Sequence, residues 1–335
     1  MGAPCDGGAG AAGGSMTTTS NAAVTRAAPP RDGLMRRASG FLHRHANLYL
    51  SLLLLPPLLW FGVVYLGSLF TLLLQSVWRF DDFTMAVSPG FTLANYLALV
   101  HDPANLDVVL RTAGMACCVT LASALLAFPV AYYMARYAKG WKKGLFYVAV
   151  MLPMWASYIV KVYAWTVILA QGGVLYWIID TLHLRAALDA LLRVPVIGGD
   201  SLSTSNIGRF LVFTYIWLPF MILPIQAAIE RIPANLLQAS ADLGAHPRQT
   251  FRTVILPLAF PGIAAGSIFT FSLTLGDYII PQLVGPSGLF IGTMVYTMQG
   301  SIGNVPMAAA FTVVPMLLIG VYLVIAKRLG AFDAL

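Results

Sequence analysis

Residues 238–257 read QASADLGAHPRQTFRTVILP, a polar segment set between two long apolar blocks. We expect a short helix over 234–243, because Gly244 can adopt the left-handed conformation that often ends a helix. Pro247 is well placed to open a second helix, since proline is tolerated in a first turn. Such a helix–glycine–helix break frees backbone polar groups that lipid cannot satisfy. Residues 233–257, which we call the elbow, are therefore predicted to lie in water or against a protein.

The composition on either side of the elbow is that of a membrane protein. Of the 335 residues, 59% are apolar and 10% are charged, and the mean hydropathy is +0.78. Soluble proteins carry roughly a quarter charged residues. The net charge of +7 does not indicate nucleic-acid binding, because the basic residues cluster beside apolar blocks, where they determine topology. Cys117 and Cys118 are adjacent within an apolar block and Cys5 is distant, so no disulfide framework is implied.

Several apolar blocks reach the roughly 20 residues that a bilayer crossing needs. The predicted spans are Leu48–Leu74, Val108–Met134, Leu145–Ala170, Phe210–Glu230, Leu258–Leu283 and Met307–Ala326. Prolines inside the first four predict kinked helices, which a bundle tolerates when neighbours satisfy the freed carbonyls. The sequence thus predicts an all-α integral membrane protein with six transmembrane helices.

Lysine and arginine predict the orientation. Most of the 20 basic residues lie before the first span, between the second and third, in the elbow and after the last span. Because cytoplasmic loops carry this excess, we expect both termini and the elbow in the cytoplasm. Residues 1–45 are rich in small and polar residues and are predicted to be a disordered cytoplasmic tail, followed by a six-helix transmembrane domain over 46–330.

The elbow also carries a family pattern. Gln238, Ala239 and Ser240, then Gly244, then Leu256-Pro257 resemble the EAA loop of membrane subunits from binding-protein-dependent ABC importers. In that family the loop is a coupling helix that docks on a separate ATPase. The chain departs from the pattern at Gln238, where the family has glutamate, and at Ser240, where it has alanine. The ATPase-coupling residues implied by this resemblance are Gln238, Ala239, Ser240, Asp242, Leu243, Gly244, Leu256 and Pro257.

Other segments resemble a subgroup of the same family. Leu152–Trp165, Tyr215–Ile232, Gly276–Gly285 and Phe91–Tyr96 are similar to stretches of spermidine/putrescine-type permeases. The resemblance implies the six-helix bundle of a type I ABC importer in the bacterial inner membrane. It also implies four kinds of partner: a second permease subunit, identical or homologous, two cytoplasmic ATPases, a periplasmic substrate-binding protein and the lipid membrane.

Ionisable residues inside apolar spans suggest where a substrate passes, because they are costly to insert. Lys161 and Asp277 are such residues. Tyr158, Lys161 and Trp165 share one helical face. The predicted pathway residues are Tyr158, Lys161, Trp165, Tyr215, Trp217, Asp277 and Tyr278. Two alternatives stay open: the aromatic residues belong to an interfacial belt, or Lys161 and Asp277 pair with each other.

The resemblance suggests an elongated cationic amine, which aromatic faces and carboxylates would bind. Lys161 on the same face suits a zwitterion, such as an amino acid derivative or an opine-like solute, about as well. No G-x-x-x-x-G-K-[ST] phosphate loop occurs in the sequence, so we expect ATP and Mg²⁺ on the partner ATPase and no cofactor, metal or catalytic residue in this chain. The alternative functions are an ATP-independent secondary transporter or channel, and a membrane scaffold.

Overall fold

The computed structural model describes residues 46–195, 197–328 and 330. The chain divides into two compact units, residues 1–65 and 66–335. The predicted disordered tail, residues 1–45, lies outside the described residues. The larger unit holds the elbow and every predicted pathway residue.

The described part of the first unit is helical. Helix α2 (Ala46–Leu59) runs into a π-helical turn, η1 (Trp60–Leu66). Pro56 and Pro57 lie inside α2 and supply no backbone N–H, which shifts the hydrogen-bond register of the turns around them. Large apolar side chains point outward around the helix, with Leu58 61% and Trp60 72% exposed. A helix that is apolar on all sides is suited to lipid.

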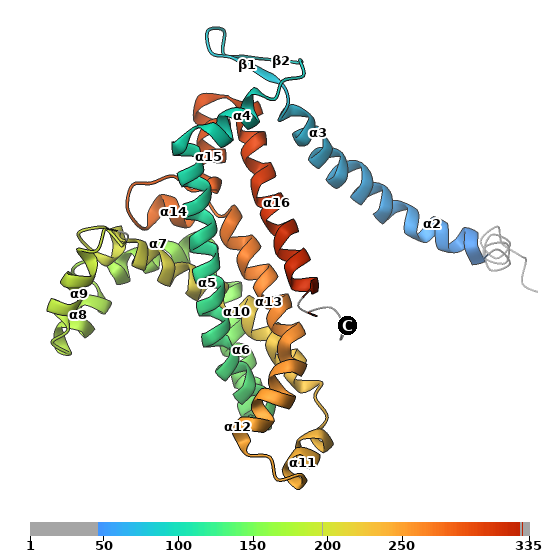
Figure 1. Cartoon of the computed structure of the whole chain (residues 1–335), viewed down its shortest axis with the longest axis vertical. Helices are drawn as coiled ribbons and strands as arrows, with labels where there is room; N and C mark the ends of the chain where they lie inside the picture. The colour runs from blue at the N-terminus through green and yellow to red at the C-terminus, as the bar shows by residue number, and fades with distance from the viewer. Residues whose placement is uncertain (1–45, 196, 329, 331–335) are drawn as a thin grey trace, which may run out of the picture. The chain divides into compact units, whose positions relative to one another are not determined.

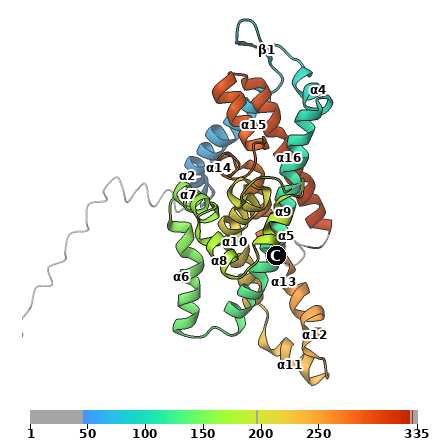
Figure 2. The same cartoon turned by 90° about the vertical axis from the view of Figure 1, so that its left-hand side faces the viewer.

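The second unit is a helical bundle with one small hairpin (Figure 1). Its elements are α3 (Gly67–Gln75), β1 (Arg79–Asp81), β2 (Ala86–Ser88), α4 (Ala94–His101), α5 (Pro103–Arg136), α6 (Trp141–Trp155), α7 (Tyr158–Leu169), α8 (Val174–Thr181), α9 (Arg185–Leu192), η2 (Leu202–Thr204), α10 (Asn206–Glu230), α11 (Ala234–Asp242), α12 (Pro247–Thr250), η3 (Phe251–Ile255), α13 (Leu256–Gly276), α14 (Ile279–Leu283), α15 (Ile291–Thr297), η4 (Met298–Ile302) and α16 (Val305–Arg328). Strands β1 and β2 pair antiparallel. In Figures 1 and 2 this hairpin and the elbow helices α11 and α12 lie at opposite ends of the unit.

Helices α5, α10 and α13 form the centre of the bundle and pack on one another along their length. Small residues on α13 allow the close approach. A Cβ on Gly262 would lie 2.5 Å from the Cβ of Ala228, and a Cβ on Gly266 would lie 2.7 Å from the sulfur of Met221. Small residues at helix contacts are the usual means of packing in membranes, where no hydrophobic force drives helices together.

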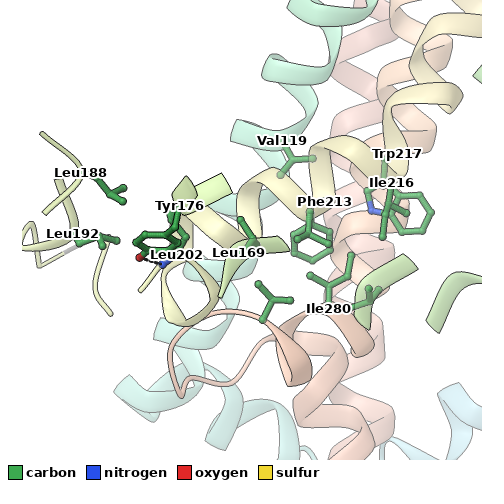
Figure 3. Packing of buried hydrophobic residues seen from close by; sticks show 13 residues of the cluster. Val119, Leu169, Tyr176, Leu188, Leu192, Leu202, Phe213, Ile216, Trp217 and Ile280 are labelled. Atoms are coloured by element: carbon green, nitrogen blue, oxygen red, sulfur yellow. Dashed lines mark hydrogen bonds between the residues drawn. The ribbon is translucent and has the colours of Figure 1, made fainter. Parts of the chain in front are cut away.

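A second apolar cluster joins α7, α8 and α9 to the first half of α10 (Figure 3). Figure 3 shows Phe213, Ile216 and Trp217 of α10 beside Ile280 of α14. At its edge, the phenolic oxygen of Tyr176 accepts a hydrogen bond of 3.1 Å from the backbone N–H of Leu202. Helix α14 is therefore packed directly against α10, one of the three central helices of the bundle.

Within the described residues, six helical stretches are long and apolar enough to cross a membrane. They are Leu50–Gln75, Pro103–Arg136, Tyr158–Thr181, Asn206–Glu230, Pro247–Gly276 and Val305–Arg328. The number of spans agrees with the sequence-based prediction, and the limits of the third and fifth differ most from the predicted ones.

The predicted continuous span Leu145–Ala170 is wrong, because the chain is extended at Ala156 and Ser157 and separates α6 from α7. The break frees the carbonyls of the last turn of α6. The ammonium of Lys161 donates to one of them, the carbonyl of Pro153, at 2.9 Å. This contact compensates for an interruption that the apolar sequence alone does not reveal.

The predicted span Leu258–Leu283 is also too long. Helix α13 ends at Gly276, and Asp277 has the extended dihedrals φ −74° and ψ 132°. A separate short helix, α14, follows. The reason is local: a carboxylate oxygen of Asp277 accepts from the backbone N–H groups of Ile279 and Ile280 at 2.8 and 3.1 Å, which starts a new helix.

Candidate functional site

The elbow has the predicted helix–glycine–helix structure. Helix α11 is followed by Gly244 at φ +78° and then by α12, which Pro247 opens. The N–H of Ala245 donates to the carbonyl of Ser240 at 3.1 Å, and that of Gly244 donates to Ala241 at 2.9 Å. These two bonds form a Schellman motif, which requires the left-handed residue at this position. The prediction of a helix stop at Gly244 is confirmed.

The tip of the elbow is exposed. Gln238, Ala239, Asp242 and Gly244 are all at the surface, and Leu243 is 89% exposed. A Cβ added to Gly244 would meet no atom within 4 Å. The two elbow helices are joined by a hydrogen bond of 2.9 Å between the hydroxyls of Ser240 and Thr250. The tip is thus a small, pre-formed surface with one prominent apolar side chain.

Leu256 and Pro257 lie at the base of the elbow, in the first turn of α13. They are separated from α12 by the π-helical turn η3. The predicted coupling residues therefore fall into two groups. The first group is at the tip: Ser240 ties the elbow helices together, and the exposed residues are Gln238, Ala239, Asp242, Leu243 and Gly244. The second group, Leu256 and Pro257, connects the elbow to the long helix α13.

A polar cluster at the base, not identified from the sequence, holds the chain where it enters the elbow. The guanidinium of Arg136 donates to the carbonyl of Ile232 at 3.0 Å. Lys143 forms an ion pair of 2.7 Å with Glu230, which also accepts from Gln226 at 2.9 Å. The hydrogen bond and charge of Glu230 raise the pKa of Lys143. Helix α6 is in this way connected to the end of α10, and α5 to the turn that precedes α11.

At the end of α13 farthest from the elbow lies a hollow of about 360 Å³. Its lining residues are Tyr158, Trp217, Ser272, Leu273, Gly276, Asp277, Tyr278 and Ile279. The extended backbone at the end of α13 brings Asp277 to its wall. There the hydroxyl of Tyr158 donates to the second carboxylate oxygen of Asp277.

Aromatic rings surround this carboxylate. The rings of Tyr158 and Trp217 stack with centroids 5.9 Å apart, and those of Tyr278 and Tyr296 stack at 5.1 Å. In the part of the chain that the structure describes, the buried indole N–H of Trp217 has no hydrogen-bond partner. A neighbouring hollow of about 430 Å³ shares Gly276 and Tyr278 with the first. Tyr296 is not among the predicted pathway residues; its helix, α15, lies between the predicted spans Leu258–Leu283 and Met307–Ala326.

The structure brings four of the predicted pathway residues together, namely Tyr158, Trp217, Asp277 and Tyr278. The other three lie elsewhere. Trp165 and Tyr215 pack on each other at 5.1 Å and do not line the hollow. Lys161 lies 6.0 Å from the Tyr158 ring centroid, but its ammonium bonds to Pro153. No ion pair joins Lys161 to Asp277 among the residues described.

The described residues contain no group of three or more His, Cys, Asp or Glu side chains that could hold a metal ion. The carboxylate of Asp277 instead has only uncharged donors as neighbours: one phenol and two backbone amides. A carboxylate has about four acceptor positions, so one remains for a donor from outside the chain. Chemically, the hollow is an acidic and aromatic site.

Comparison with known proteins decides the family. Residues 127–331 match the family described as binding-protein-dependent transport system inner membrane component. The chain belongs to this family. It is the permease subunit of an ABC importer and an inner membrane protein, which confirms the resemblance seen in the elbow.

Two curated relatives and one solved structure illustrate the similarity. The inner membrane ABC transporter permease protein YdcU of Escherichia coli strain K12 is 66% identical over 307 residues, or 92% of this chain and 97% of the relative. The spermidine/putrescine transport system permease protein PotB of the same strain is 30% identical, over 71% and 82% of the two chains. A bacterial alginate ABC transporter, in complex with an alginate-bound periplasmic protein, has a TM-score of 0.63 at 18% identity, covering 89% of this chain and 98% of its own. This last likeness shows the fold alone.

Proposed function

We propose that this chain forms half of the translocation pathway of an importer for polyamines such as putrescine or spermidine. A second permease subunit forms the other half, two cytoplasmic ATPases drive the cycle, and a periplasmic binding protein delivers the solute. The acidic, aromatic hollow around Asp277 is the observation that carries the substrate class. The PotB relative supports it, because its name specifies spermidine and putrescine.

The chemistry of the hollow favours a cationic amine. A primary ammonium can donate to the free acceptor position of Asp277 and contact the stacked faces of Tyr158 and Trp217. Cation–π contacts contribute about 0.5–2 kcal/mol each, more where water is excluded. The zwitterion alternative depended on Lys161 facing the same space, and its ammonium is bonded to Pro153 instead. We therefore retain the cationic amine.

The tip of the elbow is the proposed contact with the ATPase. An exposed Leu243 beside Ala239 and Gly244 offers an apolar side chain next to small residues, which permits close docking. A few central residues carry most of the binding energy of an interface. Movement of the ATPases would reach α13 through α12 and the base of the elbow, and α13 ends at Asp277.

ATP and Mg²⁺ belong to the partner ATPase in this proposal, because the sequence has no phosphate-binding loop of its own. Both termini and the elbow are placed in the cytoplasm, on the evidence of the basic residues beside the spans. The hairpin of β1 and β2, at the opposite end of the second unit, then faces the periplasm.

The test is uptake of radiolabelled putrescine by proteoliposomes that contain the complete transporter, with its binding protein outside and ATP inside. We expect uptake that requires both, and competition by spermidine but not by a zwitterion such as octopine. Uptake of octopine without uptake of either polyamine would overturn the substrate class. Uptake of putrescine without ATP would overturn the coupling mechanism.

A further inference from the structure

Arg209 is fully buried although it lies just before the predicted span Phe210–Glu230, outside the predicted spans. It has no carboxylate partner among the described residues. Buried arginines are usually paired or fully hydrogen-bonded, because an isolated buried charge is very costly. Its partners therefore indicate what it does.

The guanidinium of Arg209 binds backbone carbonyls of one segment. It donates to Val284 at 2.9 Å, to Pro286 at 2.9 Å and to Pro281 at 3.4 Å. Within its own helix α10 it donates to the side-chain oxygen of Asn206 at 3.1 Å. The carbonyls that it contacts lie in the last turn of α14 or just after it, where a helix leaves carbonyls without partners.

The segment is shaped to receive this guanidinium. The Arg209 Cζ lies 4.4 Å from the ring centroid of Phe290, a cation–π contact. Gly285 has φ +99°, and a Cβ there would lie 2.6 Å from the Arg209 Cζ. The N–H of Gly285 also donates to Ser203 at 2.8 Å. Only glycine satisfies both the backbone conformation and the close approach of Arg209.

Helix α14 is thus held at both ends by charged side chains. Asp277 accepts from the N–H groups at its start, and Arg209 donates to the carbonyls at its end. We propose that Arg209 is a positioning residue that fixes residues 277–290, and through them the direction of the Asp277 carboxylate in the hollow. The role assigned to Asp277 rests on the proposed function, whereas the immobilisation of the segment does not.

The first experiment measures hydrogen exchange of the purified chain. In Arg209→Met, the amides of Val284 and Gly285 should lose at least about tenfold in protection, while those of α5 keep theirs. Gly285→Ala should act in the same way, because its methyl group displaces the guanidinium. Arg111→Met is the matched control: this arginine also approaches the segment, near Gly288, but is partly exposed and paired with Asp107 at 2.5 Å. Unchanged protection in Arg209→Met, or loss throughout the bundle, would contradict the proposal.

The second experiment measures putrescine uptake by the complete transporter in Arg209→Lys, Asp277→Asn and the double variant. Lysine keeps the charge but cannot reproduce the planar set of donors. If Arg209 acts through Asp277, the double variant should transport within about twofold of Asp277→Asn, since coupled residues are not additive. If the fold losses of uptake in the two single variants multiply in the double variant, Arg209 does not act through Asp277. If Asp277→Asn itself transports normally, the proposed role of Asp277 fails, and the exchange data still decide whether Arg209 immobilises the segment.

Discussion

The elbow tip and the segment 277–290 are both short interruptions of long helices, and they are built in opposite ways. The tip is exposed and held by its own local hydrogen bonds around Gly244. The segment is held by a buried arginine of another helix and by the cluster around Phe213 and Ile280. The first is available to a partner, and the second is fixed from inside the chain.

This difference suggests that the two ends of α13 have different roles. A surface that docks on another protein must present side chains outward, whereas a site that selects a small solute must hold its groups rigidly. Helix α13 connects the two, since it begins at the elbow and ends at Asp277. Substitutions at the tip should therefore affect assembly, and substitutions in the segment should affect transport without affecting assembly.

The largest effect is expected at the tip. Gly244→Asp places a carboxylate on the docking surface, and burying an unpaired charge costs several kcal/mol. Uptake should fall below about a hundredth of wild type, with the chain still inserted in the membrane. The second measurement is ATPase retention, the amount of ATPase that co-purifies with the chain, and Gly303→Asp is its control. Gly303 has the same φ of +78° and equally open surroundings but lies outside the elbow. Equal loss of the ATPase in both variants would mean that backbone strain, not docking, causes the defect.

The next effect concerns the charge in the hollow. Asp277→Asn keeps the size of the side chain and an oxygen acceptor for the N–H groups of Ile279 and Ile280. Hydrogen bonds to charged groups are worth about 1.5–3 kcal/mol, so uptake at low putrescine should fall about ten- to hundredfold. ATPase retention should be normal. Wild-type uptake by this variant would remove Asp277 from the pathway.

A smaller change is expected from Tyr158→Phe. The variant removes the hydroxyl that donates to Asp277 but keeps the ring that stacks on Trp217. This hydrogen bond orients the carboxylate and does not itself contact the solute, so its loss should reduce uptake only about two- to tenfold. Tyr158→Ala, which also removes the ring, is the comparison and should be worse. Equal uptake in the two variants would show that stacking contributes nothing.

Lys161→Met should have less effect on transport, within about threefold of wild type, because its ammonium binds a backbone carbonyl and not Asp277. The rival hypothesis of a Lys161–Asp277 ion pair predicts otherwise. If the pair formed, Lys161→Met would do as much damage as Asp277→Asn, and combining the two would restore uptake. Measuring all three variants side by side separates these outcomes.

The smallest effect is expected for Gln238→Glu, which introduces the residue usual in the family at an exposed position. Exposed substitutions typically change stability by less than about 0.5 kcal/mol, so uptake should stay within about twofold of wild type. Uptake and ATPase retention are both measured in the same preparation. A severe loss here would mean that Gln238 contacts an acidic group on the partner.

The elbow could be predicted from the sequence because its determinants are local. Gly244 and Pro247 impose a helix stop and a helix start wherever they occur in such a context, and polar residues interrupt the apolar blocks there. The number of spans was equally accessible, because it depends on the length and composition of each block. These features need no knowledge of which helices become neighbours.

The breaks inside spans were not located, because apolar residues continue on both sides of each break. The interruption at Ala156 and Ser157 is compensated by Lys161. The break at Asp277 follows from local hydrogen bonds to Ile279 and Ile280, whereas the contact of its carboxylate with Tyr158 joins residues 119 positions apart in the chain. The burial of Arg209 and the stacking of Tyr296 on Tyr278 are likewise contacts between distant segments. A single sequence carries no direct signal for them.

The most direct test of the account is site-specific photocrosslinking of the assembled transporter from the elbow tip. A benzophenone amino acid at Leu243, the most exposed large side chain of the tip, should crosslink to the ATPase. The same probe at Phe83, fully exposed in the hairpin at the other end of the second unit, should not. Crosslinking to the ATPase from position 83 and not from position 243 would contradict both the orientation of the chain and the coupling role of the elbow.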